Sequence, residues 1–139
     1  MQPVLTDLGM KEDTVLIIDD NEVDILIASK NLELSGKFSK VVVAKNGQEA
    51  LEILNGMEDE EQPSHILVDI NMPIMDGWAF LDEFSERQTE TEEKPQVYML
   101  SSSINHTDTE RARNNPHVSE FIPKPLNNSK IESILLQKK

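Results

Sequence analysis

Short apolar runs rich in β-branched residues alternate with helical patterns five times along this chain of 139 residues. Such alternation is the sequence pattern of βαβ units, in which helices carry the chain from one parallel strand to the next. The run at residues 15–18 is apolar throughout, which is typical of a central strand covered on both faces. We therefore predict a single α/β domain with a five-stranded parallel sheet. The predicted strands are residues 15–18, 41–43, 66–68, 97–100 and 121–122, the last at an edge because Pro123 lacks a ladder donor.

Capping residues and helical spacing predict the helices between these strands. Asn21 and Asn46 are expected N-caps, with Asp24 at the third position of the first helix and Gly36 closing it. Apolar residues at helical spacing indicate which face each helix turns to the core. These residues are Val23, Leu26, Ile27 and Leu34 in the first helix, Ala50, Ile53, Leu54 and Met57 in the second, Phe80, Leu81 and Phe84 in the third, and Ile131, Ile134 and Leu135 in the last.

The fourth helical segment differs from the others. Residues 105–114 are almost entirely polar and offer Ala112 and little else for burial, and Pro116 ends the helix. An element with so little apolar anchorage is expected near the low-stability end of a fold.

The expected domain covers residues 14–139, after a loosely ordered N-terminal segment at residues 1–13. Two acidic stretches, residues 58–63 and 86–95, are expected to be solvated loops within the domain. No apolar run has membrane-spanning length and the first residues lack a signal-peptide pattern, so we expect a cytoplasmic protein.

Composition excludes several kinds of site. Asp and Glu number 26 against 13 Lys and Arg, for a formal net charge of −13. Phosphate backbones and anionic lipid repel such a chain, so direct binding to nucleic acid or membrane is disfavoured. The absence of cysteine excludes disulfides and thiol chemistry. The histidines lack the spacing of metal ligands and are expected on the surface or in loops; they are His65, His106 and His117.

Polar features that can carry chemistry follow four of the predicted strands. They are Asp19-Asp20, Asp69, Ser101 and Lys124. Right-handed crossovers bring the carboxyl ends of parallel strands to one rim of a sheet, where ligands bind. The interval from each feature to the next suits one strand–helix–strand passage. We therefore expect these side chains to meet in one site.

Three carboxylates beside one lysine predict a magnesium site. The carboxylates repel one another unless a cation intervenes, and Lys124 supplies only one positive charge. Mg²⁺ binds one or two carboxylates, keeps several waters and leaves room for a phosphate oxygen. A carboxylate could then attack phosphorus and form an acyl phosphate. Mg²⁺, Lys124 and the Ser101 hydroxyl could share the stabilisation of the transferred group.

Each feature also has a structural explanation when it is taken alone. Asp19-Asp20 could favour the positive end of the helix that follows. Asp76 and Gly77 suit an N-cap and a turn, and Trp78 is expected to pack rather than to contact a ligand. Only the combination of features indicates phosphoryl chemistry.

With these residues the chain resembles the receiver domain of bacterial two-component response regulators, across residues 14–137. The stretch from Asp69 through Met72-Pro73 to Met75-Asp76-Gly77 is the most specific match, and Lys124-Pro125 after a short strand supports it. The resemblance implies a flavodoxin-like, doubly wound fold of three α/β/α layers with strand order 2-1-3-4-5.

The resemblance also implies roles for the acidic residues. Asp69 would be the phosphoacceptor and would contribute to the metal site. Asp20, assisted by Asp19, would bind Mg²⁺, and the main-chain carbonyl of Asn71 would complete the protein ligands.

The resemblance further implies that residues in or just after the last two predicted strands contact the phosphate and form the switch. Lys124 would pair with a phosphate oxygen, and its peptide bond to Pro125 would be cis. Ser101 would be the hydroxyl switch residue, although threonine is commoner there, and Phe121 would be the aromatic switch. We hypothesise that phosphorylation biases Phe121 and the polar helix at residues 105–114 between two arrangements, which reshapes a partner surface.

The leading functional prediction is a stand-alone receiver that signals through protein–protein contact. A sensor histidine kinase or a histidine phosphotransfer protein would phosphorylate it, the downstream target would be a protein, and a homodimer formed on phosphorylation remains open. The chain would not be an enzyme beyond slow self-dephosphorylation.

Three other classes are considered. A haloacid-dehalogenase-like phosphohydrolase would need a spaced Asp-x-Asp after the first strand, where this chain has Asp19-Asp20-Asn21. A flavin carrier would need a hydroxyl-rich phosphate loop at the same place. A degenerate receiver that binds partners without phosphorylation is disfavoured, because all the chemical positions are intact.

Overall fold

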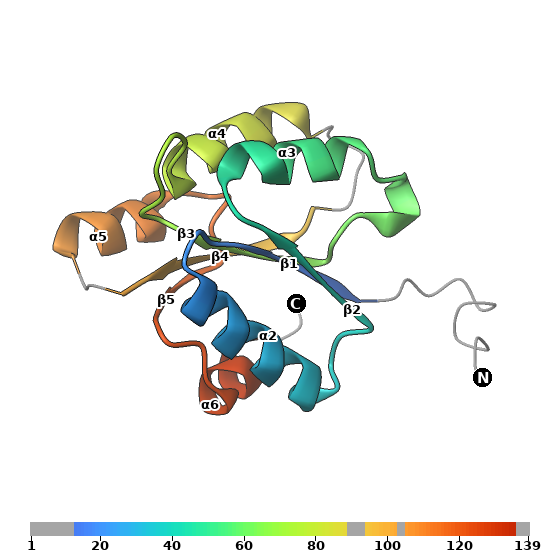
Figure 1. Ribbon diagram of the computed structural model, residues 1–139. Helices are drawn as coiled ribbons and strands as arrows, with labels where there is room; N and C mark the ends of the chain where they lie inside the picture. Colours follow the sequence, from blue (N-terminus) through green and yellow to red (C-terminus); the bar gives the residue numbers. More distant parts are fainter. Residues whose placement is uncertain (1–12, 89–93, 103–104, 136–139) are drawn as a thin grey trace.

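The structure, a computed structural model, describes residues 13–88, 94–102 and 105–135. Its strands form one parallel sheet in the order β2-β1-β3-β4-β5, which confirms the predicted order and puts β5 at an edge (Figure 1). The predicted N-terminal segment, except for residue 13, and residues 89–93 of the second acidic stretch lie outside the described residues. The strands are β1 (Thr14–Ile18), β2 (Lys40–Ala44), β3 (His65–Asp69), β4 (Gln96–Ser101) and β5 (Glu120–Pro123).

Helices cover both faces of the sheet, as the three-layer prediction requires. α3 (Gly47–Asn55) and α4 (Gly77–Arg87) lie over one face, and α2 (Glu22–Ser35) and α6 (Asn128–Lys130) lie over the other (Figure 1). α5 (His106–Asn114) lies towards the β5 edge. A 3-10 turn, η1 (Asp59–Glu61), follows α3, and a π-helical turn, η2 (Ile131–Leu135), continues α6. Among the described residues no helix has the length and apolarity needed to cross a bilayer.

The central strands are buried on both sides, which explains their uninterrupted apolar sequence. All five residues of β1 and all five of β3 are buried. Leu16 and Ile18 of β1 pack in the cluster under α3 and α4, while Val15 and Ile17 pack in the cluster under α2 and η2. Successive side chains of a strand point to opposite faces, so β1 supplies both layers of the core.

Three asparagine or aspartate side chains cap helices as predicted. Asn21 accepts from the Asp24 N–H (3.0 Å), Asn46 from the Glu49 N–H (2.8 Å) and Asp76 from the Ala79 N–H (2.8 Å). Each oxygen satisfies an N–H that has no partner within its own helix. The first helix ends as predicted in a left-handed glycine, at Gly36 (φ 71°).

The apolar face predicted for the first helix is wrong. Val23, Leu26 and Leu34 are 65%, 66% and 70% exposed, and Ile27 is also exposed. α2 buries Ala28 and Leu32 instead. Apolar residues lie all round α2, so helical spacing alone could not select the face that packs on the sheet.

The other predicted faces agree with the structure wherever it describes them. Phe80, Leu81 and Phe84 of α4 are buried, as are Ala50 and Leu54 of α3. Ile53 of α3 and Met57, which lies just beyond the end of α3, pack against the core while partly exposed. α3 also buries Leu51, which the prediction did not include. Ile131 is fully buried, and the side chains of Ile134 and Leu135 lie outside the described residues.

His65 is a second correction, because it is neither on the surface nor in a loop. It begins β3 and is 5% exposed, with its ring centroid 5.1 Å from Phe38 and 6.2 Å from Tyr98. Its Nδ1 lies 2.8 Å from the hydroxyl of Ser64. These aromatic neighbours come from other parts of the chain, so spacing could not reveal the burial. His106 and His117 are exposed as predicted.

Gly77 starts α4 directly against the end of β3. A Cβ at Gly77 would lie 2.6 Å from the carbonyl oxygen of Asp69 and 2.9 Å from the Cα of Ile70. The Gly77 N–H donates to the carbonyl of Ile70 (2.9 Å). Only glycine allows this approach, which sets the position of α4 relative to Asp69.

We expect Gly77→Ala to lower the free energy of unfolding by about 2 kcal/mol, because the added methyl group overlaps main-chain atoms. Gly56→Ala is the matched control. Gly56 has φ −86° and a Cβ there would meet only atoms at 3.7 Å, so alanine should be neutral or slightly stabilising. Urea unfolding followed by circular dichroism measures both variants. Equal stability of the two variants would contradict this account.

Candidate functional site

The carboxyl ends of four adjacent strands carry the predicted site residues. Asp19 follows β1 and Lys124 follows β5, while Asp69 is the last residue of β3 and Ser101 the last of β4. Asp19, Asp69 and Ser101 are buried, whereas Asp20 is exposed. The parallel topology therefore brings residues that lie far apart in the sequence together at the carboxyl ends of the strands.

Three of these carboxylates form a cluster able to hold a metal ion. One oxygen from each of Asp19, Asp20 and Asp69 lies within 4.8 Å of the other two. A set of oxygen ligands from two buried groups and one exposed group suits a hard divalent cation that keeps part of its water shell. The N–H of Asn71 donates to Asp69 (3.3 Å), and the role predicted for the Asn71 carbonyl stays a prediction.

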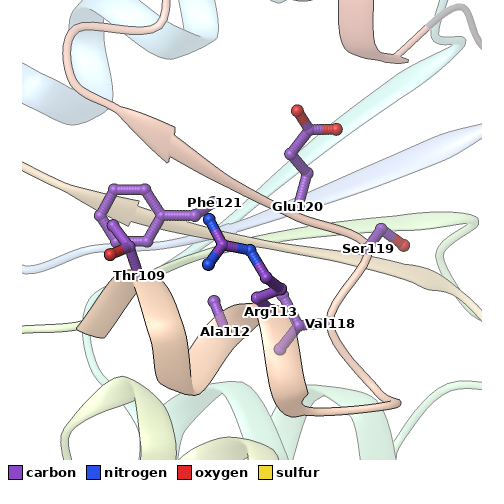
Figure 2. A pocket seen from close by; sticks show the side chains of 7 residues that line it. All are labelled: Thr109, Ala112, Arg113, Val118, Ser119, Glu120 and Phe121. Atoms are coloured by element: carbon purple, nitrogen blue, oxygen red, sulfur yellow. The ribbon is translucent and has the colours of Figure 1, made fainter. Parts of the chain in front are cut away.

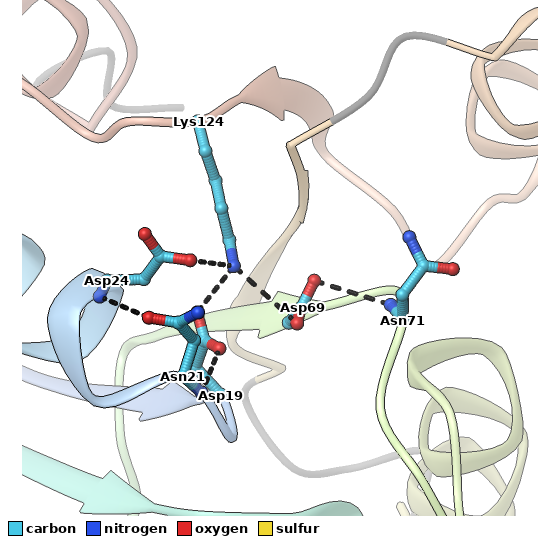
Figure 3. Close-up of polar contacts among 6 residues, drawn as sticks. All are labelled: Asp19, Asn21, Asp24, Asp69, Asn71 and Lys124. Atoms are coloured by element: carbon cyan, nitrogen blue, oxygen red, sulfur yellow. Dashed lines mark hydrogen bonds and ion pairs between the residues drawn. The ribbon is translucent and has the colours of Figure 1, made fainter.

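Lys124 lies among carboxylates, with 8% of its side chain exposed (Figure 3). Its Nζ is 2.8 Å from Asp19, 2.8 Å from Asp24 and 3.5 Å from Asp69. Burial acts to lower the pKa of Lys124, but hydrogen bonds to Asp19 and Asp24 and the charge of Asp69 raise it above its ordinary value. The ammonium is therefore charged at neutral pH.

The environment of Asp69 favours its protonated form. Burial and the charge of Asp19 raise the pKa of Asp69 from 3.8 to about 6, while Lys124 and the Asn71 N–H act in the opposite direction. At neutral pH the carboxylate is ionised, but burial and the charge of Asp19 make its ionised form less stable than that of an ordinary aspartate. A cation bound at the cluster would lower the pKa of Asp69 and favour its ionised form.

The loop that carries Lys124 is held at both ends. The ammonium of Lys130 donates to the carbonyl of Pro123 (2.6 Å) and to that of Pro125 (3.1 Å). The Lys124 N–H donates to the carbonyl of Ser101 (2.8 Å). The Lys124–Pro125 bond is cis, which confirms what the resemblance implied.

The loop after Asp69 contains an unusual turn at Ile74. This residue has φ 72°, and the N–H of Met75 donates to the carbonyl of Pro73 (2.7 Å). A β-branched residue rarely adopts positive φ, and a turn closed by such a bond is strained. Ile74 is also 86% exposed, so its side chain offers no packing in return.

Trp78 connects α4 to α5. It is 5% exposed, which agrees with the predicted packing role. Its Nε1 lies 3.3 Å from the Asp108 carboxylate, and the Arg111 guanidinium lies 4.5 Å from its ring centre. Because Ala112 is the buried residue of α5, these contacts add to the limited packing that holds that helix.

Sequence reasoning missed two residues at the site, Asp24 and Lys130. Asp24 was recognised only as an early helix position, although it lies one turn after Asp19-Asp20 and so on the same rim. Lys130 lies six residues beyond Lys124, and nothing in the sequence shows that its ammonium turns back to main-chain carbonyls.

The fold and this group of charges define a class: a flavodoxin-like α/β domain with an acidic cluster and a buried lysine at the carboxyl edge of its sheet. Within that class, the family model of the response regulator receiver domain matches residues 15–136. The chain belongs to the response regulator receiver domain family.

Individual relatives agree with this membership. The chain is 37% identical, over 89% of its length, to protein-glutamate methylesterase/protein-glutamine glutaminase 3 of Rhodospirillum rubrum. It spans about a third of the length of that relative and a quarter or less of several others. A two-component response regulator from Cytophaga hutchinsonii superposes with a TM-score of 0.82 at 28% identity, covering 91% of this chain and 96% of the other. The phosphorylated cyanobacterial phytochrome response regulator RcpA superposes with a TM-score of 0.75 at 27% identity, covering 92% of this chain and 97% of the other.

We expect Asp69→Asn to raise the free energy of unfolding by about 2 kcal/mol at about pH 7.5 in buffer free of divalent cations. Because the pKa of Asp69 is higher in the folded than in the unfolded protein, the folded state binds the proton more tightly. The wild type therefore loses stability as the pH rises from about 4 to about 6, and asparagine escapes this loss. Urea unfolding at about pH 4 and at about pH 7.5 measures the difference between the two proteins, which should be much smaller at the acidic pH.

Asp59→Asn is the control, because Asp59 is an exposed carboxylate of η1 outside the cluster. It should leave stability unchanged at either pH. Millimolar MgCl₂ should stabilise the wild type more than Asp69→Asn, because the variant lacks a ligand. A gain from Asp69→Asn that persists in acid would show that the titration of Asp69 is not its cause.

Proposed function

We propose that this chain is a phosphoacceptor switch of a cytoplasmic two-component phosphorelay. Asp69 takes a phosphoryl group from a phosphohistidine of a sensor histidine kinase or a histidine phosphotransfer protein. The observation that carries the proposal is the surroundings of Asp69: Asp19 and Asp20 within 4.8 Å and the Lys124 ammonium at 3.5 Å. The family membership and the phosphorylated state of the relative RcpA support it.

Asp69 would act as the nucleophile. One carboxylate oxygen attacks phosphorus, the bond from phosphorus to the donor's imidazole nitrogen breaks, and that nitrogen keeps the electron pair. Mg²⁺ held by Asp19, Asp20 and Asp69, with the Asn71 carbonyl, would neutralise charge on the phosphoryl oxygens. Lys124 would pair with one of these oxygens, and the Ser101 hydroxyl would turn to donate to another. Slow attack of water on the aspartyl phosphate would be the only turnover.

The exposed face of α2 supports a protein donor. Val23, Leu26, Ile27 and Leu34 leave apolar side chains in solvent, and Asp24 of the same helix contacts the site lysine. Exposed apolar side chains beside a reactive group suit the packing of a partner helix. A small phosphodonor would need no such surface.

The groove between α5 and β5 supports an output surface for a downstream protein. It has a volume of about 400 Å³ and combines apolar and charged side chains (Figure 2). Phe121 projects into it beside α5, and Ser101 ends the neighbouring strand. We propose that Ser101 and Phe121 change arrangement together when Asp69 is phosphorylated and so reshape this groove. The groove is lined by Thr109, Ala112, Arg113, Val118, Ser119, Glu120 and Phe121.

Intact mass spectrometry tests the phosphoacceptor role. With acetyl phosphate and MgCl₂ we expect the mass to rise by about 80 Da, one phosphoryl group. Chelation of Mg²⁺ or Asp69→Asn should abolish this gain, whereas Asp76→Asn, which changes an exposed N-cap carboxylate, should leave it intact. Rapid turnover of phosphate esters would indicate a phosphohydrolase instead, and no gain at all would indicate a degenerate receiver.

Amide hydrogen exchange tests the switch. On phosphorylation we expect exchange in α5 and β5 to change several-fold, because α5 has little buried apolar surface and can shift at low cost. α3, which packs Ala50, Leu51 and Leu54 in the core, is the internal control and should change little. Unchanged exchange at residues 105–114 would contradict the proposed rearrangement.

A further inference from the structure

Lys124 is held more closely by Asp24 than by the proposed phosphoacceptor. Its Nζ makes contacts of 2.8 Å with Asp19 and Asp24, and Asp69 is farther away at 3.5 Å. Asp24 comes from α2 and reaches the ammonium from the side opposite Asp69 (Figure 3). Asp24 is not one of the three carboxylates of the metal cluster.

We propose that Asp24 is a positioning residue that restrains Lys124 in the unphosphorylated protein and competes with the phosphoryl group for its ammonium. The inference rests on the proposed function, since it concerns the same lysine. An N–H···O contact between charged groups is strongest at about 2.7–2.9 Å, so at 3.5 Å the ammonium is displaced from Asp69 towards Asp24. Under this proposal, Lys124 weakens its contact with Asp24 when it binds a phosphoryl oxygen.

The contact is not a by-product of helix capping. The Asp24 N–H is already satisfied by the side chain of Asn21 (3.0 Å), so the cap needs only the main chain of Asp24. An acidic side chain near a helix N-terminus has a general electrostatic benefit, which Glu22 in the same turn shares. Glu22 pairs instead with exposed Lys45 (3.1 Å) and does not contact Lys124. Glu22 therefore controls for charge at this end of α2.

Removal of the Asp24 charge should leave the fold intact. Asp24 is 27% exposed through its side chain, and Lys124 keeps Asp19 and Asp69 as partners. The restraint predicts that Asp24→Asn gains function: Lys124 becomes available to the phosphoryl group. A purely structural role for Asp24 would lower the melting temperature and would not tighten binding.

The experiment measures the apparent Kd for beryllofluoride, a phosphoryl mimic, by NMR titration with MgCl₂. Asp24→Asn should bind the mimic about three- to fivefold more tightly than the wild type, the upper part of the range expected for one partly exposed charged contact. Asp24→Glu retains the charge and should return the Kd to within about twofold of wild type, as should Glu22→Gln. Melting temperatures confirm that each variant is folded.

A double-mutant cycle separates restraint of Lys124 from simple repulsion of an anion. In a Lys124→Gln background, titrated to higher mimic concentration, Asp24→Asn should change the Kd by less than about twofold. The same tightening in both backgrounds, or weaker binding by Asp24→Asn alone, overturns the inference and leaves the proposed function standing. A wild type that binds no mimic would overturn the proposed function and the inference with it.

Discussion

A single ammonium group, that of Lys124, compensates a concentration of negative charge at the end of the sheet. Three carboxylates, those of Asp19, Asp24 and Asp69, lie within 3.5 Å of it, and the exposed Asp20 joins Asp19 and Asp69 in the acidic cluster. One positive charge cannot neutralise this group, so the site retains an excess of negative charge that favours a bound cation. Burial, together with the charge of Asp19, raises the pKa of Asp69 even though Lys124 lies beside it.

The scaffold makes this unfavourable grouping tolerable. The buried strands β1 and β3 place Asp19 and Asp69 side by side, and the resulting repulsion is small beside the apolar burial of two continuous cores. Fixed main-chain contacts hold the loops: Gly77 packs on the backbone of Asp69, and Lys130 clamps the loop of Lys124. The unfavourable repulsion is confined to the site, and the stability of the rest of the domain outweighs it.

Features set by local chemistry could be predicted from the sequence, and features set by distant packing could not. The strands, the caps at Asn21, Asn46 and Asp76, and the meeting of the site residues follow from short-range patterns and the geometry of parallel sheets. The buried face of α2 was mispredicted because apolar residues surround that helix, and His65 because its aromatic neighbours are distant in sequence. Asp24 was missed because a carboxylate in a first helical turn already has a sufficient local explanation.

Trp78 is the only tryptophan in the chain, and its place gives the protein an intrinsic optical probe. It follows Gly77, which packs on the backbone of Asp69, and its indole contacts the charged groups of Asp108 and Arg111 on α5. A cation over an indole ring alters its emission, so any separation of α5 from α4 changes the fluorescence of the unlabelled protein. The rearrangement of α5 proposed above could therefore be followed in real time by the fluorescence of Trp78.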